Sequence, residues 1–191
     1  LSKKQFLHML NKIIALAILL FLSPILLIFS IIILFDDGLP IFFMQKRIGR
    51  KNEYFHIIKF RTMKKDTKEI ATHLVKNFEN NILFSGHFLR KYSIDELPQL
   101  INILMGQMNF IGPRPALHNQ YDLIKLRNKY NISKLKPGVT GWAQVNGRDE
   151  ISIEKKVKLD YYYLKNKSLI INIKILFMTL IKVISKEGVS H

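Results

Sequence analysis

The stretch Ile13 to Phe35 reads IIALAILLFLSPILLIFSIIILF, 23 residues without one charged side chain. As a continuous α-helix it would be about 34 Å long, close to the ~30 Å hydrocarbon core of a bilayer. A soluble protein rarely contains a helix that is so long and so uniformly apolar. A cleaved signal peptide has a shorter apolar run, followed by a cleavage site of small residues. The sequence therefore predicts that this segment inserts into a membrane.

The centre and the flanks of this segment bear on how it lies in the membrane. Ser23-Pro24 stands at the centre, and proline removes a backbone hydrogen bond and bends a helix. A re-entrant helix, broken at Ser23-Pro24, would enter and leave by one face and keep both basic flanks on the cytoplasmic side. We favour this form, with a kinked single span as the alternative, because prolines are common in membrane helices. The basic flanks consist of Lys3, Lys4 and Lys12 before the segment, and of Lys46, Arg47, Arg50 and Lys51 after it.

The rest of the chain shows shorter periodic segments separated by turns. The stretches PIFFMQKRIG (40–49) and EYFHIIKFRTM (53–63) predict two short strands around a polar turn. Apolar residues at helical spacing between 97 and 104 predict a short helix that ends near Gly106, and 121–130 also has a helical pattern. The apolar segment 13–35 is thus followed by a predicted hairpin and several short helices.

These patterns define the predicted architecture. The apolar stretch 169–184 is interrupted by polar residues, so it suits a helix in the headgroup plane or packed on the domain. We predict an α+β fold with a re-entrant membrane helix and its flanks at 1–40. A mostly helical domain at 41–191 should carry a small β-hairpin or sheet and amphipathic interfacial helices.

Composition narrows the possible functions. The chain has 191 residues, 48% of them hydrophobic, and a formal charge of +16. A strongly basic but hydrophobic chain is unlike a disordered one and suggests an anionic partner: nucleic acid, an anionic membrane or phosphorylated substrates. There is no cysteine, which excludes disulfides, thiolate metal sites and thiol nucleophiles. The six histidines have no HExxH-type spacing, so a histidine-based metal site is not expected.

Two adjacent carboxylates stand out in YSIDELPQL (92–100), in a chain with 30 Lys and Arg against 14 Asp and Glu. Asp95 suits a helix N-cap, with Pro98 at the third helical position, where its missing N–H has no cost. Ser93 with Glu96 also fits a capping box, although Pro98 would then interrupt the second turn. Taken alone, the pattern favours a capped helix without a catalytic role.

The same position also allows chemistry. A carboxylate at a helix N-terminus stays ionised, and the N–H groups there can bind phosphate. Asp95 could then act as a nucleophile toward phosphorus. Glu96, or both carboxylates, could hold a divalent cation that neutralises phosphate oxygens.

Such chemistry needs cations near the carboxylates, although each cation alone is a weak signal in a basic protein. Lys59 and Arg61 are two residues apart, so on a strand they would point to one face. Arg90 lies five residues before Asp95. Arg114 stands between two prolines in GPRP, which restrict its backbone and aim a forked donor suited to phosphate. The candidates for reading a base or sugar are Gln144 and Asn146, with Arg148 beside them.

Three long motifs occur in a recognisable order: PIFFMQKRIGRKNEYFHIIKFRTM, FLRKYSIDELPQLINILMGQMNFIGPRP and KPGVTGWAQVNGR. Together they resemble the bacterial sugar transferases, which are monotopic polyprenyl-phosphate phosphoglycosyl transferases. The resemblance covers almost the whole chain except the polar stretch around 64–84, and it looks like the minimal single-domain form. It implies a re-entrant helix broken at Ser23-Pro24, with the domain half-embedded in the bacterial inner membrane on its cytoplasmic face.

The resemblance also implies roles for single residues. Asp95 and Glu96 match a catalytic Asp-Glu dyad, with Asp95 as the nucleophile and both residues at the required magnesium ion. Asp160 matches an acidic residue of a D-x-Y-Y segment and is grouped with the substrate-binding candidates. The family usually has an acidic residue where Gln107 stands and Ser where Asn109 stands, so an acidic role at that loop is in doubt here. The family positions for phosphate or nucleotide binding match Lys59, Arg61, Arg90, Arg114 and Arg148.

The predicted reaction follows from the resemblance. A sugar-1-phosphate would pass from a UDP-sugar to undecaprenyl phosphate through a covalent Asp95 intermediate, releasing UMP and starting glycan, exopolysaccharide or glycoprotein assembly, with downstream glycosyltransferases as possible partners. The stretch VNGRDEISIEKK looks closest to members that act on N-acetylated amino-sugars, with glucose or galactose left open.

Three alternatives come from other classes of protein. A non-catalytic membrane-anchored lipid-binding or scaffold protein would explain the anchor and the charge but not the paired motifs. A nucleic-acid binder is not expected, because the aromatic residues are not interleaved with Lys and Arg as stacking platforms require. A phosphatase with an aspartyl-phosphate intermediate would release sugar phosphate to water without a lipid acceptor.

Overall fold

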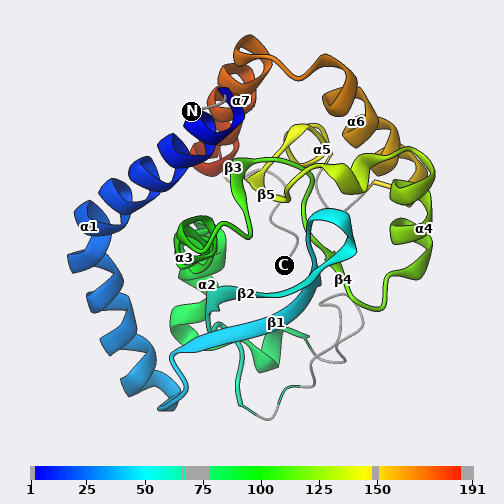
Figure 1. The fold of residues 1–191 in the computed structure, drawn as a ribbon. Coiled ribbons are helices and arrows are strands. Elements are labelled where there is room, and N and C mark those ends of the chain that lie inside the picture. The colour runs from blue at the N-terminus through cyan, green and yellow to red at the C-terminus, as the bar shows by residue number, and fades with distance from the viewer. Residues whose placement is uncertain (1–2, 66, 68–77, 148–150, 186–191) are drawn as a thin grey trace.

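The computed structural model describes residues 3–65, 67, 78–147 and 151–185 (Figure 1). A long helix, α1, is followed by a β-hairpin and then by short helices and strands. In chain order the main elements are α1 (Lys3–Asp37), β1 (Phe42–Ile48), β2 (Tyr54–Phe60), α2 (Phe84–Lys91), α3 (Gln99–Leu104), β3 (Asn109–Ile111), β4 (Ala116–Leu117), α4 (Tyr121–Lys129), β5 (Gly138–Thr140), α5 (Trp142–Val145), α6 (Ile153–Asn166) and α7 (Leu169–Ser185). Short 3-10 turns join them at η1 (Arg50–Asn52), η3 (Phe78–Asn81), η4 (Ile94–Glu96) and η5 (Ile132–Lys134). The predicted α+β class with a mostly helical domain is confirmed.

Helix α1 contains Pro24 in its interior, and its ribbon changes direction about halfway along, so that it wraps one side of the molecule (Figure 1). Because Pro24 has no N–H, it cannot donate to the carbonyl of Leu20, four residues earlier. The Ser23 hydroxyl donates to that carbonyl at 2.8 Å instead. The break expected at Ser23-Pro24 is therefore a bend within one continuous helix. That both ends of the helix lie on one membrane face stays a prediction.

The hairpin predicted after the membrane segment is present. Strands β1 and β2 pair antiparallel from Phe42–Phe60 to Ile48–Tyr54, and β4 joins the other edge of β1. The turn between them is tight, since Lys51 and Asn52 have φ of 54° and 66°. A separate parallel pair, β3 with β5, brings the GPRP and KPGVTG turns together.

This parallel pair needs glycine at the point of contact. A Cβ on Gly138 would lie 2.1 Å from the backbone nitrogen of Gly112, and a Cβ on Gly112 would lie 2.3 Å from the carbonyl oxygen of Lys136. Only residues without a side chain allow the two turns to approach so closely. The turn that carries Arg114 is thereby fixed to the rest of the domain.

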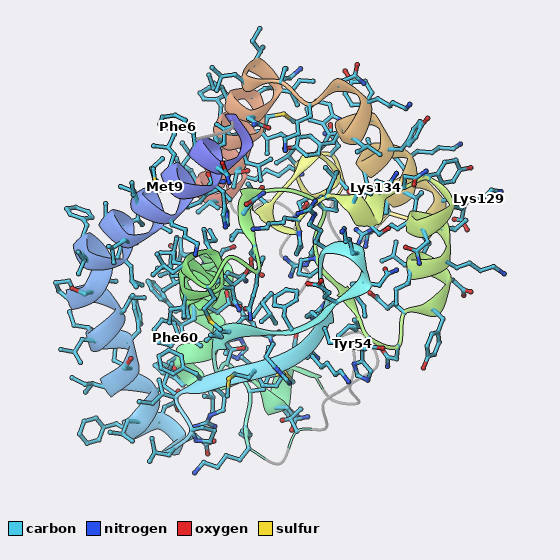
Figure 2. All side chains as sticks on the ribbon, in the orientation of Figure 1. Phe6, Met9, Tyr54, Phe60, Lys129 and Lys134 are labelled. Atoms are coloured by element: carbon cyan, nitrogen blue, oxygen red, sulfur yellow. The ribbon has the colours of Figure 1, made fainter. Side chains whose placement is uncertain are left out.

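Helix α1 packs on the domain through two apolar clusters. In its first half, Ala15 is fully buried in a cluster with Phe55 and Ile57 of β2 and with Leu100 and Ile103 of α3. In its second half, Ile33 packs with Phe60, Leu83 and Leu89, and Figure 2 places Phe60 on the side of the hairpin toward α1. The predicted boundary at residue 40 therefore crosses a shared core.

The outer surfaces of α1 and α7 are apolar and exposed. Phe21 and Phe35 of α1 are 81% and 86% exposed, and Leu169 and Ile170 of α7 are 75% and 79% exposed. By length and composition, residues Gln5–Asp37 form the one helix of the described chain that could cross a membrane. Soluble proteins rarely expose such large continuous apolar patches, so these two surfaces suit contact with lipid.

The predicted cap at Asp95 is wrong. Residues Ile94–Glu96 form a 3-10 turn after Ser93, which has a left-handed conformation and makes no side-chain cap hydrogen bond. Helix α3 begins only after Pro98, where the absence of an N–H is tolerated. The expected capping box is absent as well. The Glu96 side chain accepts hydrogen bonds from Lys59 and Arg114 and not from the Ser93 backbone.

Candidate active site

Glu96 is held between two cations that come from distant parts of the chain. Its Oε1 atom accepts a hydrogen bond from Lys59 Nζ at 2.6 Å and from Arg114 NH2 at 3.0 Å. Burial would raise the pKa of Glu96, but Arg114 and Lys59 outweigh burial and hold that pKa well below its ordinary 4.5. Glu96 is therefore ionised and fixed in position.

Asp95 has a different environment, although it is the neighbouring residue. Its carboxylate accepts no hydrogen bond from any residue that the structure describes, and its one ion pair there is Lys59 Nζ to Oδ2 at 3.8 Å. Its side chain is 12% exposed. Burial raises the pKa of Asp95 above its ordinary 3.8, while Lys59, Arg90 and Arg114 oppose that rise and Glu96 adds to it. Asp95 is thus a carboxylate surrounded by cations but bound closely by none of them.

Asn102, a fully buried residue of α3, links this helix to the strand that carries Lys59. The Asn102 amide accepts from the Ile58 N–H at 3.0 Å and donates to the His56 carbonyl at 2.8 Å, as a neighbouring strand would. It thereby fixes strand β2, which carries Lys59, against the helix that follows Glu96. The sequence analysis missed Asn102, whose signal was an amide on an otherwise apolar helix face.

Gln107 completes this arrangement. Its Oε1 atom accepts a second hydrogen bond from the Asn102 amide at 2.7 Å. An amide oxygen and a carboxylate oxygen are both acceptors, so this contact needs no negative charge. The departure from the family pattern at Gln107 is therefore compatible with the geometry around the dyad.

Arg114 reaches Glu96 from a turn that two other arginines hold. Arg47 donates to the Pro115 carbonyl at 3.1 Å, and Arg127 donates to the Arg114 carbonyl at 2.8 Å. Arg127 is in turn paired with Asp160, whose Oδ2 lies 2.6 Å from Arg127 NH2. Asp160 therefore supports the Arg114 backbone indirectly, through Arg127. Asp160 itself is buried, with 1% of its surface exposed.

Arg90 and Arg61 occupy contrasting places. Arg90, in α2, donates to the Thr62 hydroxyl at 2.8 Å, and its guanidinium contributes to the field at Asp95. Burial lowers the pKa of Arg90, and Asp95 opposes that effect. Arg61 instead binds the turn after α1: it pairs with the Asp37 carboxylate and donates to the carbonyls of Pro40 and Gly38. The structure therefore gathers Arg90, but not Arg61, near the dyad.

Arg61 was expected on the same face as Lys59, but strand β2 ends at Phe60, so the alternation of a strand no longer applies at residue 61. Gln144 and Asn146 lie on and just after α5, and their side-chain amides donate to the Val139 and Trp142 carbonyls. The structure shows neither of them in contact with Glu96 or Asp95. Arg148 lies outside the described residues.

The dyad suits a small divalent cation. Magnesium commonly binds through one or two carboxylates plus substrate phosphates and keeps several waters. Glu96 Oε2 and the Asp95 carboxylate accept no hydrogen bond from the part of the chain that the structure describes, so both are available to an ion. Within the same described residues, no group of three or more His, Asp and Glu side chains gathers into a closed metal site. An open site completed by phosphates fits this donor set.

The arrangement is chemically suited to displacement at phosphorus. An ionised carboxylate attacking a phosphate meets repulsion between anions, and cations positioned beforehand relieve it. Lys59, Arg90 and Arg114 supply such cations around Asp95. Glu96 keeps two of them in place without blocking the Asp95 carboxylate.

Comparison with known proteins gives a consistent result. The family model described as bacterial sugar transferase matches residues 2–186. The chain is 39% identical to the uncharacterized sugar transferase EpsL of Bacillus subtilis over 170 residues, covering 88% of this chain and 83% of that protein. It is 32% identical to the exopolysaccharide production protein ExoY of Sinorhizobium fredii, covering 98% and 88%. It is 36% identical to the UDP-glucose:undecaprenyl-phosphate glucose-1-phosphate transferase of Escherichia coli, covering 89% of this chain and 38% of that longer protein.

Proposed function

We propose that this chain, which belongs to the bacterial sugar transferase family, transfers a sugar-1-phosphate from a UDP-sugar to undecaprenyl phosphate. The relative from Escherichia coli is named for this type of reaction. One observation supports the proposal most directly: Asp95 is without a hydrogen-bond donor among the described residues, beside a Glu96 that two cations hold.

The reaction takes place in two displacements at one phosphorus. An Asp95 carboxylate oxygen attacks the β-phosphorus, and the bond from that phosphorus to the bridging oxygen breaks. UMP leaves with the electron pair, and an aspartyl phosphate that carries the sugar remains. An oxygen of undecaprenyl phosphate then attacks the same phosphorus, and the Asp95 carboxylate leaves. One diphosphate is broken and one is made, so no oxidant, reductant or added energy source is needed.

The residues around Asp95 have separate roles in this scheme. Lys59 and Arg114 stay on Glu96 and present their remaining donors to the phosphates, and a forked guanidinium suits phosphate oxygens. Arg90 adds positive potential at Asp95. Asp95 and Glu96 would hold magnesium, which when bound neutralises phosphate oxygens.

The membrane arrangement belongs to the same proposal. One substrate is soluble and the other is a lipid, so the dyad should lie at headgroup depth on the cytoplasmic face of the inner membrane. A re-entrant α1 would hold the domain there, since its outer surface is apolar and its inner surface shares two clusters with the domain. The charge of +16 suits both anionic lipids and phosphorylated substrates.

The proposal also includes the identity of the transferred sugar. We expect an N-acetylated amino-sugar from the stretch around 145–156, whereas two relatives of this chain have names that include UDP-galactose and UDP-glucose. A panel of UDP-sugars covering both kinds therefore belongs in the test.

Intact-protein mass spectrometry tests the proposal. Detergent-solubilised protein is mixed with magnesium and each UDP-sugar, without lipid acceptor. We expect an added sugar-phosphate mass with one of them, absent in Asp95→Asn and discharged by undecaprenyl phosphate. UMP release only when lipid is present, without an adduct, would contradict the covalent step. Discharge of the adduct by water alone would favour a phosphatase, and no turnover with any sugar would favour a lipid-binding scaffold.

A further inference from the structure

Three basic side chains meet at a second place, away from the dyad. His8 and Lys12 come from the first turns of α1, and Lys136 comes from the KPGVTG turn before β5. Lys136 Nζ lies 3.3 Å from His8 Nδ1 and 3.5 Å from His8 Nε2. Residues 128 positions apart are therefore brought into contact.

The surface beneath them is bare backbone. Gly106, in the turn after α3, has φ of +79°, a conformation that side chains rarely adopt. A Cβ at this position would lie 3.4 Å from the His8 ring and 3.7 Å from Lys12 Cε. Both side chains thus lie over the Gly106 turn, and the absence of a side chain there leaves room beside them.

One charge of the cluster, that of Lys12, has no anionic partner among the described residues. The Lys12 ammonium makes no hydrogen bond or ion pair with any residue that the structure describes. The side-chain amide of Asn11, beside Lys12, donates to the Asn109 side-chain oxygen of β3 at 3.4 Å, and this contact is neutral. An anion placed over the Gly106 turn would meet two ammonium groups, and the His8 ring could add a donor.

The depth of the cluster indicates what kind of anion can reach it. Lys12 directly precedes Ile13, where the charge-free stretch begins, so the cluster lies at the boundary between hydrocarbon and headgroups if α1 is embedded. Phe6 and Met9 are 53% and 44% exposed, and Figure 2 shows them on the outer side of α1, at the same end of the helix. Acyl chains would contact that outer side, and the group presented to the cluster would be a headgroup.

We propose that His8, Lys12 and Lys136, over the Gly106 turn, form a binding site for the phosphate group of a membrane lipid, separate from the catalytic dyad. The cluster adjoins the carboxyl end of α3, whereas Glu96 precedes its amino end. A bound headgroup would fix the first half of α1, and with it the depth at which α3 and the dyad lie. The inference depends on α1 lying in a membrane, not on the chemistry at Asp95.

Native mass spectrometry of the full chain in neutral detergent tests this site. The protein is titrated with phosphatidylglycerol or with phosphatidylcholine of the same acyl chains, and the Kd of the first bound lipid is measured. In Lys12→Gln/Lys136→Gln we expect the Kd for phosphatidylglycerol to rise about 25-fold, roughly fivefold for each lysine. The matched control is Lys125→Gln/Lys129→Gln, which removes the same charge at two exposed positions of α4, on the opposite side of the molecule from α1 (Figure 1).

Further variants and competing ligands separate the possible explanations of a change in Kd. Lys12→Arg/Lys136→Arg should keep the wild-type Kd, which distinguishes loss of the site from misfolding, and Asp95→Asn should keep it as well. An equal rise in both Gln double variants would overturn the site, because the effect would then be general attraction to a basic surface. Displacement of phosphatidylglycerol by an equimolar amount of inorganic phosphate would overturn a lipid as the source of the phosphate. Equal binding of phosphatidylcholine would overturn the role of net negative charge.

Discussion

Two acidic sites in this basic chain differ in one respect, which is access. At the dyad, Glu96 is 17% and Asp95 is 12% exposed by side chain, and Asp95 has no hydrogen-bond donor in the described chain. In the second site, Asp160 is 1% exposed and pairs with Arg127 through two guanidinium nitrogens. Both sites place carboxylates against cations, but only the dyad leaves a carboxylate open to a substrate.

The comparison indicates how similar ion pairs can serve different ends. A closed pair with its hydrogen bonds made is a structural unit, and breaking it leaves a buried charge alone. An open pair with an excess of cations is poised for an anionic ligand. The two are connected, because Arg127 also holds the Arg114 carbonyl, and Arg114 binds Glu96. The closed site thus positions part of the open one.

The sharpest difference should appear in Asp95→Asn. Loss of the nucleophile should reduce UMP release by on the order of 10⁴ or more. The melting temperature should stay the same or rise, because a buried charge without hydrogen bonds is removed. Turnover with radiolabelled UDP-sugar and thermal unfolding in detergent measure both. Asp122→Asn, an exposed change in α4, is the control, and a comparable loss of activity in it would show that the assay reports general damage.

Asp160→Asn should give the opposite pattern. Leaving Arg127 buried without its partner should cost about 3–5 kcal/mol of unfolding free energy. Activity per folded molecule should fall less than in Asp95→Asn, since Arg114 loses only a support. Denaturant titration and turnover of the folded fraction check this.

A double change tests whether the pair at Asp160 is structural. Arg127→Met/Asp160→Leu should recover much of the lost stability, because no charge is left unpaired. If the double variant were stable yet as inactive as Asp95→Asn, the Arg127–Asp160 pair would be required for the chemistry and not for stability alone.

The decline in the rate of adduct formation at low pH provides a third comparison. Asp95 must be ionised to attack, and burial raises its pKa, so adduct formation should decline on acidification at a higher pH than for an ordinary aspartate. Lys59 opposes that rise in pKa, so in Lys59→Gln the rate should begin to decline at a still higher pH. At a given acidic pH, the rate should fall tenfold for each unit by which the pKa of Asp95 rises. Single-turnover adduct formation against pH measures it.

Lys46→Gln is the matched control for the pH profile, since Lys46 is an exposed lysine of the neighbouring strand that stacks over Tyr54. If the pH at which the rate declines rose equally in both variants, the effect would be a general one of charge. If that pH fell in Lys59→Gln, the result would contradict the role given to Lys59.

Much of this architecture could be predicted because it depends on local patterns. The membrane helix, the hairpin and the helix at 121–129 each follow from periodicity within one short window. The Asp-Glu pair and Arg114 are also visible in the sequence, and the structure brings Arg114 to Glu96, while their catalytic roles stay predictions. The apolar surface of α7 follows in the same way from the stretch 169–184.

Apart from Arg61, where the strand ends one residue early, the failures have a common physical cause, which is contact between distant residues. Asp95 was expected to cap a helix, but Glu96 binds Lys59, 37 residues earlier, and the local capping pattern gives way. Arg127 and Asp160 are 33 residues apart, and no spacing rule pairs them. Asn102 supports β2 across 44 residues. Local patterns can be read from sequence, whereas the choice of partner among many charges depends on the folded core.

The smallest expected effect concerns Gln107, where the family usually has an acid. Gln107→Glu should change turnover and stability little, within about 1 kcal/mol, because a carboxylate oxygen can still accept from the Asn102 amide. Gln107→Leu should cost about 1–3 kcal/mol, since one buried amide hydrogen loses its acceptor while the other keeps the His56 carbonyl. Turnover should fall with stability in Gln107→Leu, because Asn102 links α3 to the strand that carries Lys59. Parallel measurement of unfolding free energy and adduct formation checks both changes. A large gain or loss of activity in Gln107→Glu, with stability unchanged, would mean that this position acts through charge and that the open site extends as far as Gln107.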